Sequence, residues 1–265
     1  MDNLAFPDGA AGGADTPIVE LQDIHLSIQG KPILRGLNMV VQPQERMVIL
    51  GQSGAGKSTL LRLILGLIYP QRGKVLFKGR NVLTSPPNQL NAIRRRIGMV
   101  HQYSALISSL TVRDNLALPL EELTRKSREE IDHIVAEKLA LVGMEETEPL
   151  YPNELSGGMR KRVSIARALV MDPELLLFDE PSAGLDPIIS NVIDELIISL
   201  SEKARVTSII VTHELDSAFH IATRMAMLYQ GRIVEEDNPE RFRRKQNPVV
   251  AQFLGGHNHG KDVPL

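Results

Sequence analysis

The sequence of 265 residues has no cysteine, no tryptophan and only 4% aromatic residues. Without cysteine, the chain cannot form disulfide bonds, use a thiolate nucleophile or hold zinc or an iron–sulfur cluster through sulfur ligands. The same absence fits a reducing compartment. Any chemistry that the chain performs must therefore use oxygen and nitrogen groups.

The sequence also lacks an excess of either charge and a long apolar run. Its 30 lysines and arginines nearly balance 32 aspartates and glutamates, so the net charge of −2 gives no overall attraction to nucleic acid or anionic lipid. No stretch approaches the roughly 20 apolar residues of a membrane-spanning helix, and residues 1–15 lack the pattern of a signal peptide. We therefore expect a cytoplasmic protein without a nucleic-acid partner.

Apolar residues are nevertheless plentiful, at 43%, and their spacing indicates an α/β fold. Short apolar runs at residues 175–178, 208–211 and 225–229 are separated by helical patterns, as parallel strands joined by crossover helices are. Runs of β type at residues 18–21 and 47–50, with turn residues between them, predict a strand-rich beginning. The sequence therefore predicts a mainly parallel sheet packed against helices.

Composition and periodicity divide the chain into three parts. Residues 1–17, rich in Gly, Ala and Asp, predict a flexible tail; residues 18–245 predict the folded domain, and residues 246–265 a C-terminal tail. Helical periodicity predicts a helical subdomain at about residues 103–169, and the basic triplet at residues 160–162 is interpreted as a solvated helix face. Four apolar residues of the C-terminal tail are expected to dock on this chain or on a neighbour: Val249, Val250, Phe253 and Leu254.

A glycine-rich loop follows the apolar run at residues 47–50. It matches the pattern G-x-x-x-x-G-K-[ST] and precedes a helix expected to begin near Lys57. In such a loop the backbone N–H groups surround phosphate oxygens, Lys57 would bridge the β- and γ-phosphates, Ser58 would bind Mg²⁺, and Thr59 would add a phosphate contact. The loop and its flanks predict binding of ATP with Mg²⁺ through Gly51, Gln52, Ser53, Gly54, Ala55, Gly56, Lys57, Ser58 and Thr59.

Two carboxylates, Asp179 and Glu180, follow the apolar run at residues 175–178. Carboxylates at the carboxyl end of a parallel strand lie where open α/β sheets bind ligands. Asp179 would hold Mg²⁺ directly or through water, and Glu180 would act as the general base on the attacking water. Together with the phosphate loop, this pair predicts nucleotide hydrolysis.

A second glycine turn, Leu155-Ser156-Gly157-Gly158-Met159, opens a basic helical segment. With this turn the sequence resembles the ATP-binding cassette (ABC) ATPases, whose signature is Leu-Ser-Gly-Gly-Gln. The resemblance implies a P-loop NTPase fold with an antiparallel β subdomain and an α-helical subdomain. It also implies that Gln102 is the Q-loop glutamine that contacts Mg²⁺ and water, that Asp186 lies in the D-loop, and that His213 is the switch histidine at the γ-phosphate.

The resemblance further implies that two copies stack head to tail, so that the signature turn of one copy covers the ATP of the other. Ser156, Gly157, Gly158 and Met159 form that turn. Met159 replaces the usual glutamine, which should matter little because backbone amides and Ser156 make the phosphate contacts. Ile28 stands where the family has an aromatic residue that stacks on adenine, so the preference for ATP is an expectation, and the role of His101 beside Gln102 is open.

Three stretches, residues 102–120, 182–194 and 247–255, resemble the ATPase subunit of MCE-type, Mla-like phospholipid transporters. This resemblance implies a multi-span permease, an MCE lipid-binding protein and, as a further candidate, a small STAS-domain regulator as partners. It places the chain peripherally on the cytoplasmic face of the inner membrane.

Three alternatives remain. An ABC importer of polar solutes such as amino acids would share all the ATP residues and differ only in its partner. A soluble ABC ATPase of DNA repair or translation would usually carry coiled-coil insertions or tandem cassettes. A P-loop kinase would leave the signature turn and His213 without a role.

Overall fold

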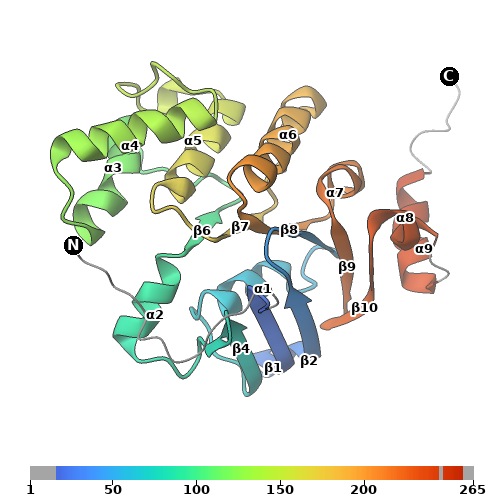
Figure 1. Cartoon of the computed structure of the whole chain (residues 1–265). Coiled ribbons are helices and arrows are strands. Elements are labelled where there is room, and N and C mark those ends of the chain that lie inside the picture. The colour runs from blue at the N-terminus through green and yellow to red at the C-terminus, as the bar shows by residue number, and fades with distance from the viewer. Residues whose placement is uncertain (1–15, 245–246, 259–265) are drawn as a thin grey trace, which may run out of the picture.

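The computed structural model describes residues 16–244 and 247–258. Most of the predicted N-terminal tail, residues 1–15, and the end of the predicted C-terminal tail, residues 259–265, lie outside the described residues. The described chain forms two sheets with helices around them (Figure 1). Within these described stretches, no helix is both long enough and apolar enough to cross a bilayer.

The larger sheet has six strands in the order β10-β9-β3-β8-β7-β6. All neighbours in it are parallel except β10, which pairs antiparallel with β9. This topology confirms the predicted α/β fold with a mainly parallel core sheet. Its strands are β3 (Arg46–Leu50), β6 (Ile97–Val100), β7 (Leu175–Asp179), β8 (Thr207–Thr212), β9 (Arg224–Tyr229) and β10 (Arg232–Asp237).

The smaller sheet has the order β2-β1-β4-β5 and is antiparallel throughout. Strands β1 and β2 form a hairpin whose turn residues Gln29 and Gly30 have φ angles of 50° and 77°. Left-handed angles of this kind match the twist of a hairpin. The sheet confirms the antiparallel β subdomain implied by the resemblance. Its strands are β1 (Val19–Ile28), β2 (Lys31–Val41), β4 (Arg72–Phe77) and β5 (Arg80–Asn81).

The core sheet lies between two hydrophobic cores, and successive side chains of its central strands belong to one core and then the other. On β3, Met47 and Ile49 belong to the core that includes the antiparallel sheet and α1 (Lys57–Ile64), whereas Val48 and Leu50 belong to the core under the other helices. Residues 47–50 of β3 and 175–178 of β7 are apolar and buried because both faces of a parallel sheet are covered. The strands are therefore held from two sides, which fixes the positions from which the loops at their carboxyl ends begin.

Helices α3, α4 and α5 form a layer at one end of the molecule, green to yellow in Figure 1, and α6 and α7 lie beside it. Side-chain caps begin several of them: Thr111 caps α3, Ser127 forms a capping box with Glu130 at α4, and Ser156 caps α5. The helices beyond α1 are α2 (Pro87–Arg94), α3 (Val112–Leu123), α4 (Arg128–Leu141), a 3₁₀ turn (Pro152–Glu154), α5 (Gly157–Leu169), α6 (Pro187–Lys203), α7 (Leu215–Ile221), α8 (Pro239–Arg243) and α9 (Pro248–Asn258).

The C-terminal segment differs from its sequence-based interpretation as a tail. Residues 248–258 form α9, and Val250 is fully buried in the same core as α3 to α7. Val249, Phe253 and Leu254 are partly buried and pack against that core. The apolar spacing thus makes a helix that docks on this chain, and the folded part of the molecule extends past residue 245.

The docking of α9 can be tested with two neighbouring substitutions. Val250→Asp should lower the free energy of unfolding by more than about 2 kcal/mol, because it places an unpaired charge in a core. Ala251→Asp, at an exposed position of the same helix, should change it by less than about 0.5 kcal/mol. Urea unfolding measures both. Equal effects of the two substitutions would contradict the docking.

Candidate functional site

The parallel strands β3, β7 and β8 bring the predicted site residues to one edge of the core sheet. The glycine-rich loop follows β3, Glu180 follows β7, His213 follows β8, and Gln102 lies just beyond β6. Together they enclose a cavity of about 410 Å³, a size common for small-molecule sites. Its lining residues are Ile33, Ser53, Gly54, Gly56, Lys57, Ser58, Thr59, Gln102, Glu180 and His213.

The loop of residues 51–56 has a backbone that requires glycine. Gly54 and Gly56 have φ angles of 79° and 101°, in the left-handed region. At Gly51, a Cβ would lie 2.6 Å from the carbonyl oxygen of Leu228. The loop therefore turns tightly and delivers its N–H groups to the start of α1, which begins at Lys57 as expected.

Lys57 is buried and lies across the loop. Its ammonium donates hydrogen bonds to the carbonyl oxygens of Gly51 at 2.7 Å and Gln52 at 3.3 Å. It also forms an ion pair with Glu180, with Nζ 3.2 Å from Oε1. The residue predicted to bind phosphate and the residue predicted to act on water therefore lie in one site.

Glu180 is held between a cation and an imidazole. Its Oε2 lies 2.9 Å from Nδ1 of His213 and accepts a hydrogen bond from the His213 backbone N–H at 3.2 Å. Burial by itself would raise the pKa of Glu180, but the contacts of His213 and Lys57 outweigh it and hold the pKa below its usual value. The carboxylate is therefore ionised at neutral pH and can accept a proton.

Oxygen groups suited to Mg²⁺ meet beside Lys57. The Ser58 hydroxyl donates a hydrogen bond to Oδ1 of Asp179 at 2.8 Å, and Gln102 lines the same cavity. Hydroxyl, carboxylate and amide oxygens are hard ligands, and Mg²⁺ in nucleotide sites takes only one or two from the protein. The described residues contain no group of three or more acidic, His or Cys side chains that could hold a metal alone. The donor set thus fits an ion shared with phosphates.

The signature turn is placed differently. Ser156 caps α5 by accepting a hydrogen bond from the N–H of Met159 at 3.2 Å, and a Cβ on Gly158 would lie 2.6 Å from Cγ2 of Ile189 in α6. Among the described residues that line the cavity at Lys57, none comes from this turn. Asp186 also lies outside that lining and caps α6, where it accepts hydrogen bonds from the N–H groups of residues 188 and 189 at 3.0 Å.

The apolar wall of the cavity comes from Ile33 rather than Ile28. Ile28 ends β1, is 44% exposed and does not line the cavity, whereas Ile33 of β2 lines it and packs beside Gly56. A Cβ on Gly56 would lie 3.0 Å from Cγ2 of Ile33. The sequence alone holds no motif for Ile33, because it is one apolar residue in an ordinary strand pattern.

Lys161 corrects the interpretation of the basic triplet as a solvated face. This residue of α5 is 2% exposed, and its ammonium donates to the carbonyl oxygens of His101 at 3.0 Å and Gln102 at 2.7 Å. Burial lowers the pKa of Lys161 to about 8, while the charge of Asp179 opposes that change. A triplet of basic residues gives no sequence signal for which member is buried.

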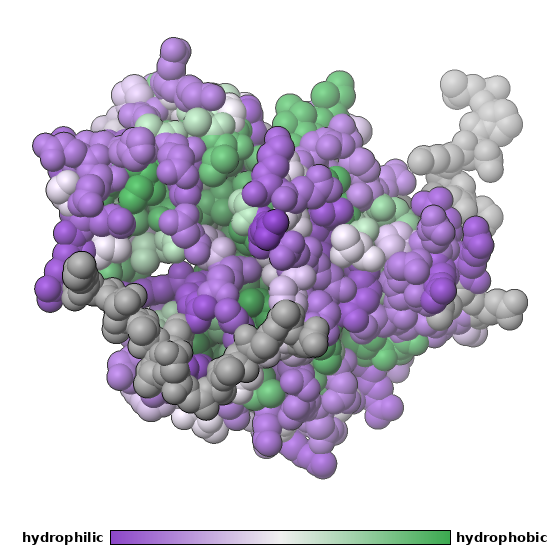
Figure 2. All heavy atoms as spheres, viewed as in Figure 1, coloured by the Kyte–Doolittle hydropathy of each residue, from purple (hydrophilic) through white to green (hydrophobic). Residues whose placement is uncertain are grey.

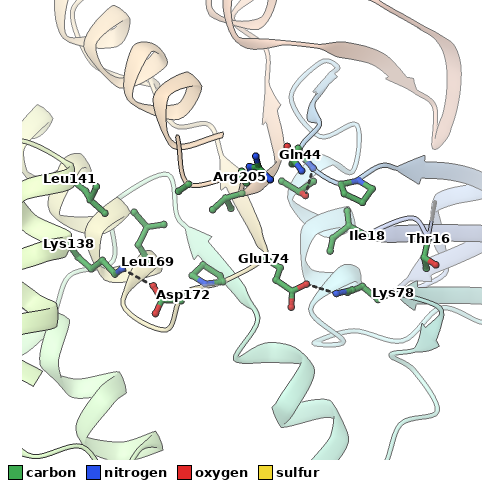
Figure 3. Close-up of a pocket in the computed structure, with 15 residues that line it drawn as sticks. Thr16, Ile18, Gln44, Lys78, Lys138, Leu141, Leu169, Asp172, Glu174 and Arg205 are labelled. Atoms are coloured by element: carbon green, nitrogen blue, oxygen red, sulfur yellow. Dashed lines mark hydrogen bonds and ion pairs between the residues drawn. The ribbon is translucent and has the colours of Figure 1, made fainter. Parts of the chain in front are cut away.

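A second cavity, of about 360 Å³, lies at the opposite end of the core strands (Figure 3). Four of its charged side chains form two ion pairs: Lys138 lies 2.7 Å from Asp172, and Lys78 lies 2.7 Å from Glu174. These pairs join α4 and the antiparallel sheet to the segment before β7. The cavity therefore carries structural ion pairs, and the reactive groups gather at the carboxyl edge.

The depressed pKa of Glu180 predicts a pH effect on stability. A group whose pKa is lowered by folding stabilises the fold above its unfolded pKa, about 4.3 for glutamate, and this stabilisation is lost as the pH falls through the lower folded pKa. The free energy of unfolding of the wild type should therefore fall relative to that of Glu180→Gln below about pH 4.3. Denaturant titrations at several pH values measure the difference. A difference that stays constant would contradict the contacts of Glu180.

Comparison with known proteins identifies relatives of the whole cassette. A family model described as ABC transporter matches residues 34–183, more than half of the chain. The probable ribonucleotide transport ATP-binding protein mkl of Mycobacterium tuberculosis (strain H37Rv) is 38% identical over 242 residues, which cover 91% of this chain and 67% of mkl. The intermembrane phospholipid transport system ATP-binding protein MlaF of Haemophilus influenzae is 36% identical over 243 residues, which cover 92% of each chain.

A solved structure shares the fold. The dimeric post-hydrolysis structure of the ATP-binding cassette MJ0796, bound to ADP and Pi, is 33% identical, has a TM-score of 0.76, and covers 83% of this chain and 98% of that one. The resemblance to ABC ATPases is thus confirmed by sequence and by fold. The chain belongs to the ABC transporter family and is an ATPase built on an ATP-binding cassette.

Proposed function

We propose that this chain is the ATP-binding subunit of a phospholipid transport system, in which two copies hydrolyse ATP at a shared interface. The dimer is inferred from the position of the signature turn. This turn begins α5 and does not line the cavity of its own chain. A glycine turn that opens a helix suits a phosphate, so it serves the cavity of a second copy. The dimeric cassette with ADP and Pi supports this arrangement.

Binding of ATP is the task of the loop and α1. The N–H groups of residues 51–56 surround the phosphates, Lys57 leaves its carbonyl partners for the β- and γ-phosphates, and Thr59 adds a donor. Ser58, Asp179 and Gln102 hold Mg²⁺, which when bound neutralises phosphate charge.

Hydrolysis is the task of Glu180 and His213. Glu180 is an ionised carboxylate in the cavity, and it accepts a proton from the attacking water. His213 fixes Glu180 through two hydrogen bonds and orients it toward the γ-phosphate. Asp186, at the start of α6, forms the D-loop that faces the second copy.

The transported substrate is inferred from relatives. MlaF, named for intermembrane phospholipid transport, matches this chain over 92% of both sequences, so the two proteins have the same extent as well as similar residues. The alternative is transport of a polar solute, which the name of mkl supports. Both alternatives use the same ATP site and differ in partner.

Partners would meet the segment after β6. Tyr103 is 87% exposed beside Gln102, and Ile107 is 40% exposed. Exposed apolar side chains next to a nucleotide site suit a protein contact. We assign this segment to a multi-span permease, with an MCE-type lipid-binding protein and a STAS-domain regulator as further subunits. The chain would then sit peripherally on the cytoplasmic face of the inner membrane.

The proposed base predicts the behaviour of Glu180→Gln. This variant should bind ATP as the wild type does and hydrolyse it at least about 100-fold more slowly, because a general base contributes roughly 10² to 10⁴ in rate. With ATP and Mg²⁺ it should accumulate as a dimer in size-exclusion chromatography. Glu195→Gln, which changes an exposed glutamate of α6 that pairs with His220, serves as the control. Hydrolysis at the wild-type rate would remove Glu180 from the role of base.

The proposed transport function is tested by isolating the native complex. The chain is tagged in its own host, the membranes are solubilised gently, and co-purifying proteins and lipids are identified by mass spectrometry. A permease with an MCE-domain protein and bound phospholipid is expected. A solute-binding protein with a different permease would leave the ATPase unchanged and replace phospholipid by a polar solute.

A further inference from the structure

One face of α5 holds the backbone of the segment that contains Gln102. Lys161, Ser164 and Arg167 are spaced by three residues and therefore share a face of the helix. Ser164 Oγ donates to the carbonyl oxygen of Ser104 at 2.9 Å. Arg167 donates to the carbonyl oxygens of Ala105 at 2.8 Å and Ser104 at 3.2 Å. With the two bonds from Lys161, four of the five carbonyl groups of residues 101–105 accept from α5.

The segment depends on these donors because its own backbone is unfavourable. Ser104 and Ala105 have φ angles of 60° and 51°, which cost free energy for residues with a Cβ. Tyr103 is 87% exposed and contributes little packing. The path of residues 101–105 is therefore set largely by the side chains of α5, whereas Asn115 of α3 bonds to the backbone of residues 107, 110 and 111.

Lys161 contacts the backbone of Gln102 directly. Its bond to the carbonyl oxygen of Gln102, at 2.7 Å, fixes the backbone of a residue that lines the cavity. The neighbouring bond to His101, at 3.0 Å, fixes the preceding peptide. A buried ammonium with two carbonyl acceptors has little freedom, so it limits the orientations that Gln102 can adopt.

We propose that Lys161 is a positioning residue for ATP hydrolysis: it fixes the backbone of Gln102 so that the Gln102 side chain stays in the cavity. Helix α5 begins at the signature turn, which is assigned to the ATP of the second copy. The same helix therefore connects that turn with Gln102, which lies at the ATP site of its own chain. This inference rests on the role of Gln102 under the proposed function and adds the residue that controls it.

Arg162 offers a matched control on the same helix. Its guanidinium donates to the carbonyl oxygens of Val142 and Gly143, at 3.3 Å and 2.9 Å, whereas the bonds from α5 to residues 101–105 described above come from Lys161, Ser164 and Arg167. Replacement of either residue by Met removes a charge and two carbonyl contacts. The two variants differ in whether the lost contacts belong to the Gln102 segment.

The experiment compares steady-state ATP hydrolysis of wild type, Lys161→Met, Lys161→Arg, Arg162→Met, Gln102→Ala and the double variant of Lys161→Met with Gln102→Ala. Lys161→Met should lower kcat at least about 10-fold and change the KM for ATP less than about 3-fold, because positioning acts on the chemical step. Lys161→Arg should restore most of kcat, and Arg162→Met should stay within about 2-fold of wild type. The double variant should be no slower than Gln102→Ala, because residues that act through one another are not additive.

Several outcomes would overturn the inference: wild-type kcat in Lys161→Met, an equal loss in Arg162→Met, or additive effects in the double variant. Should Lys161→Met fail to fold in thermal unfolding, Ser164→Ala removes a single donor from the same face. It should lower kcat with KM unchanged, and a wild-type kcat would again count against the inference. If Gln102→Ala keeps wild-type kcat, the role proposed for Gln102 fails. If Gln102→Ala is slow and Lys161→Met is not, only the present inference fails.

Discussion

The order of strands β3, β8 and β7 is the constraint on which the site depends. Because these strands are adjacent and parallel, Lys57, His213 and Glu180 leave the sheet at the same edge. The N–H of Glu180 donates to the carbonyl oxygen of Val211, which carries the pairing of β7 and β8 one residue beyond the strand. The position of the ionised carboxylate of Glu180 is thus set by the hydrogen bonds between β7 and β8 and by the two hydrophobic cores that pack against these strands. The placement of the carboxylate that we propose as the proton acceptor therefore follows from sheet packing.

Much of this site could be predicted from the sequence because its chemistry is written in short, contiguous patterns. The phosphate loop and the pair Asp179 and Glu180 can be recognised by their residue types and by the apolar strands before them. The topology also follows from alternating strands and helices. The sequence indicated roles for Gln102 and His213 only through resemblance to a family. In the structure, both residues line one cavity with Lys57.

Other features could not be predicted because they depend on contacts distant in the chain. Lys161 is buried by a segment 60 residues earlier, and its neighbours Arg160 and Arg162 look the same in sequence. Ile33 reaches the cavity only because the hairpin of β1 and β2 lies over Gly56. For α9, the spacing of apolar residues indicated docking, but only the packing of Val250 shows which surface receives it.

The aliphatic wall formed by Ile33 affects how small molecules could compete at the cavity. Among the described lining residues, Ile33 is the large apolar side chain, and no Phe, Tyr or Trp lines the cavity with it. A flat inhibitor ring gains burial of apolar area against isoleucine but no contact between aromatic faces, which is worth about 0.5–1.5 kcal/mol between rings. Compounds that gain affinity by stacking on an aromatic side chain should therefore bind this cavity less tightly, whereas compounds shaped to a branched aliphatic surface should bind it more tightly.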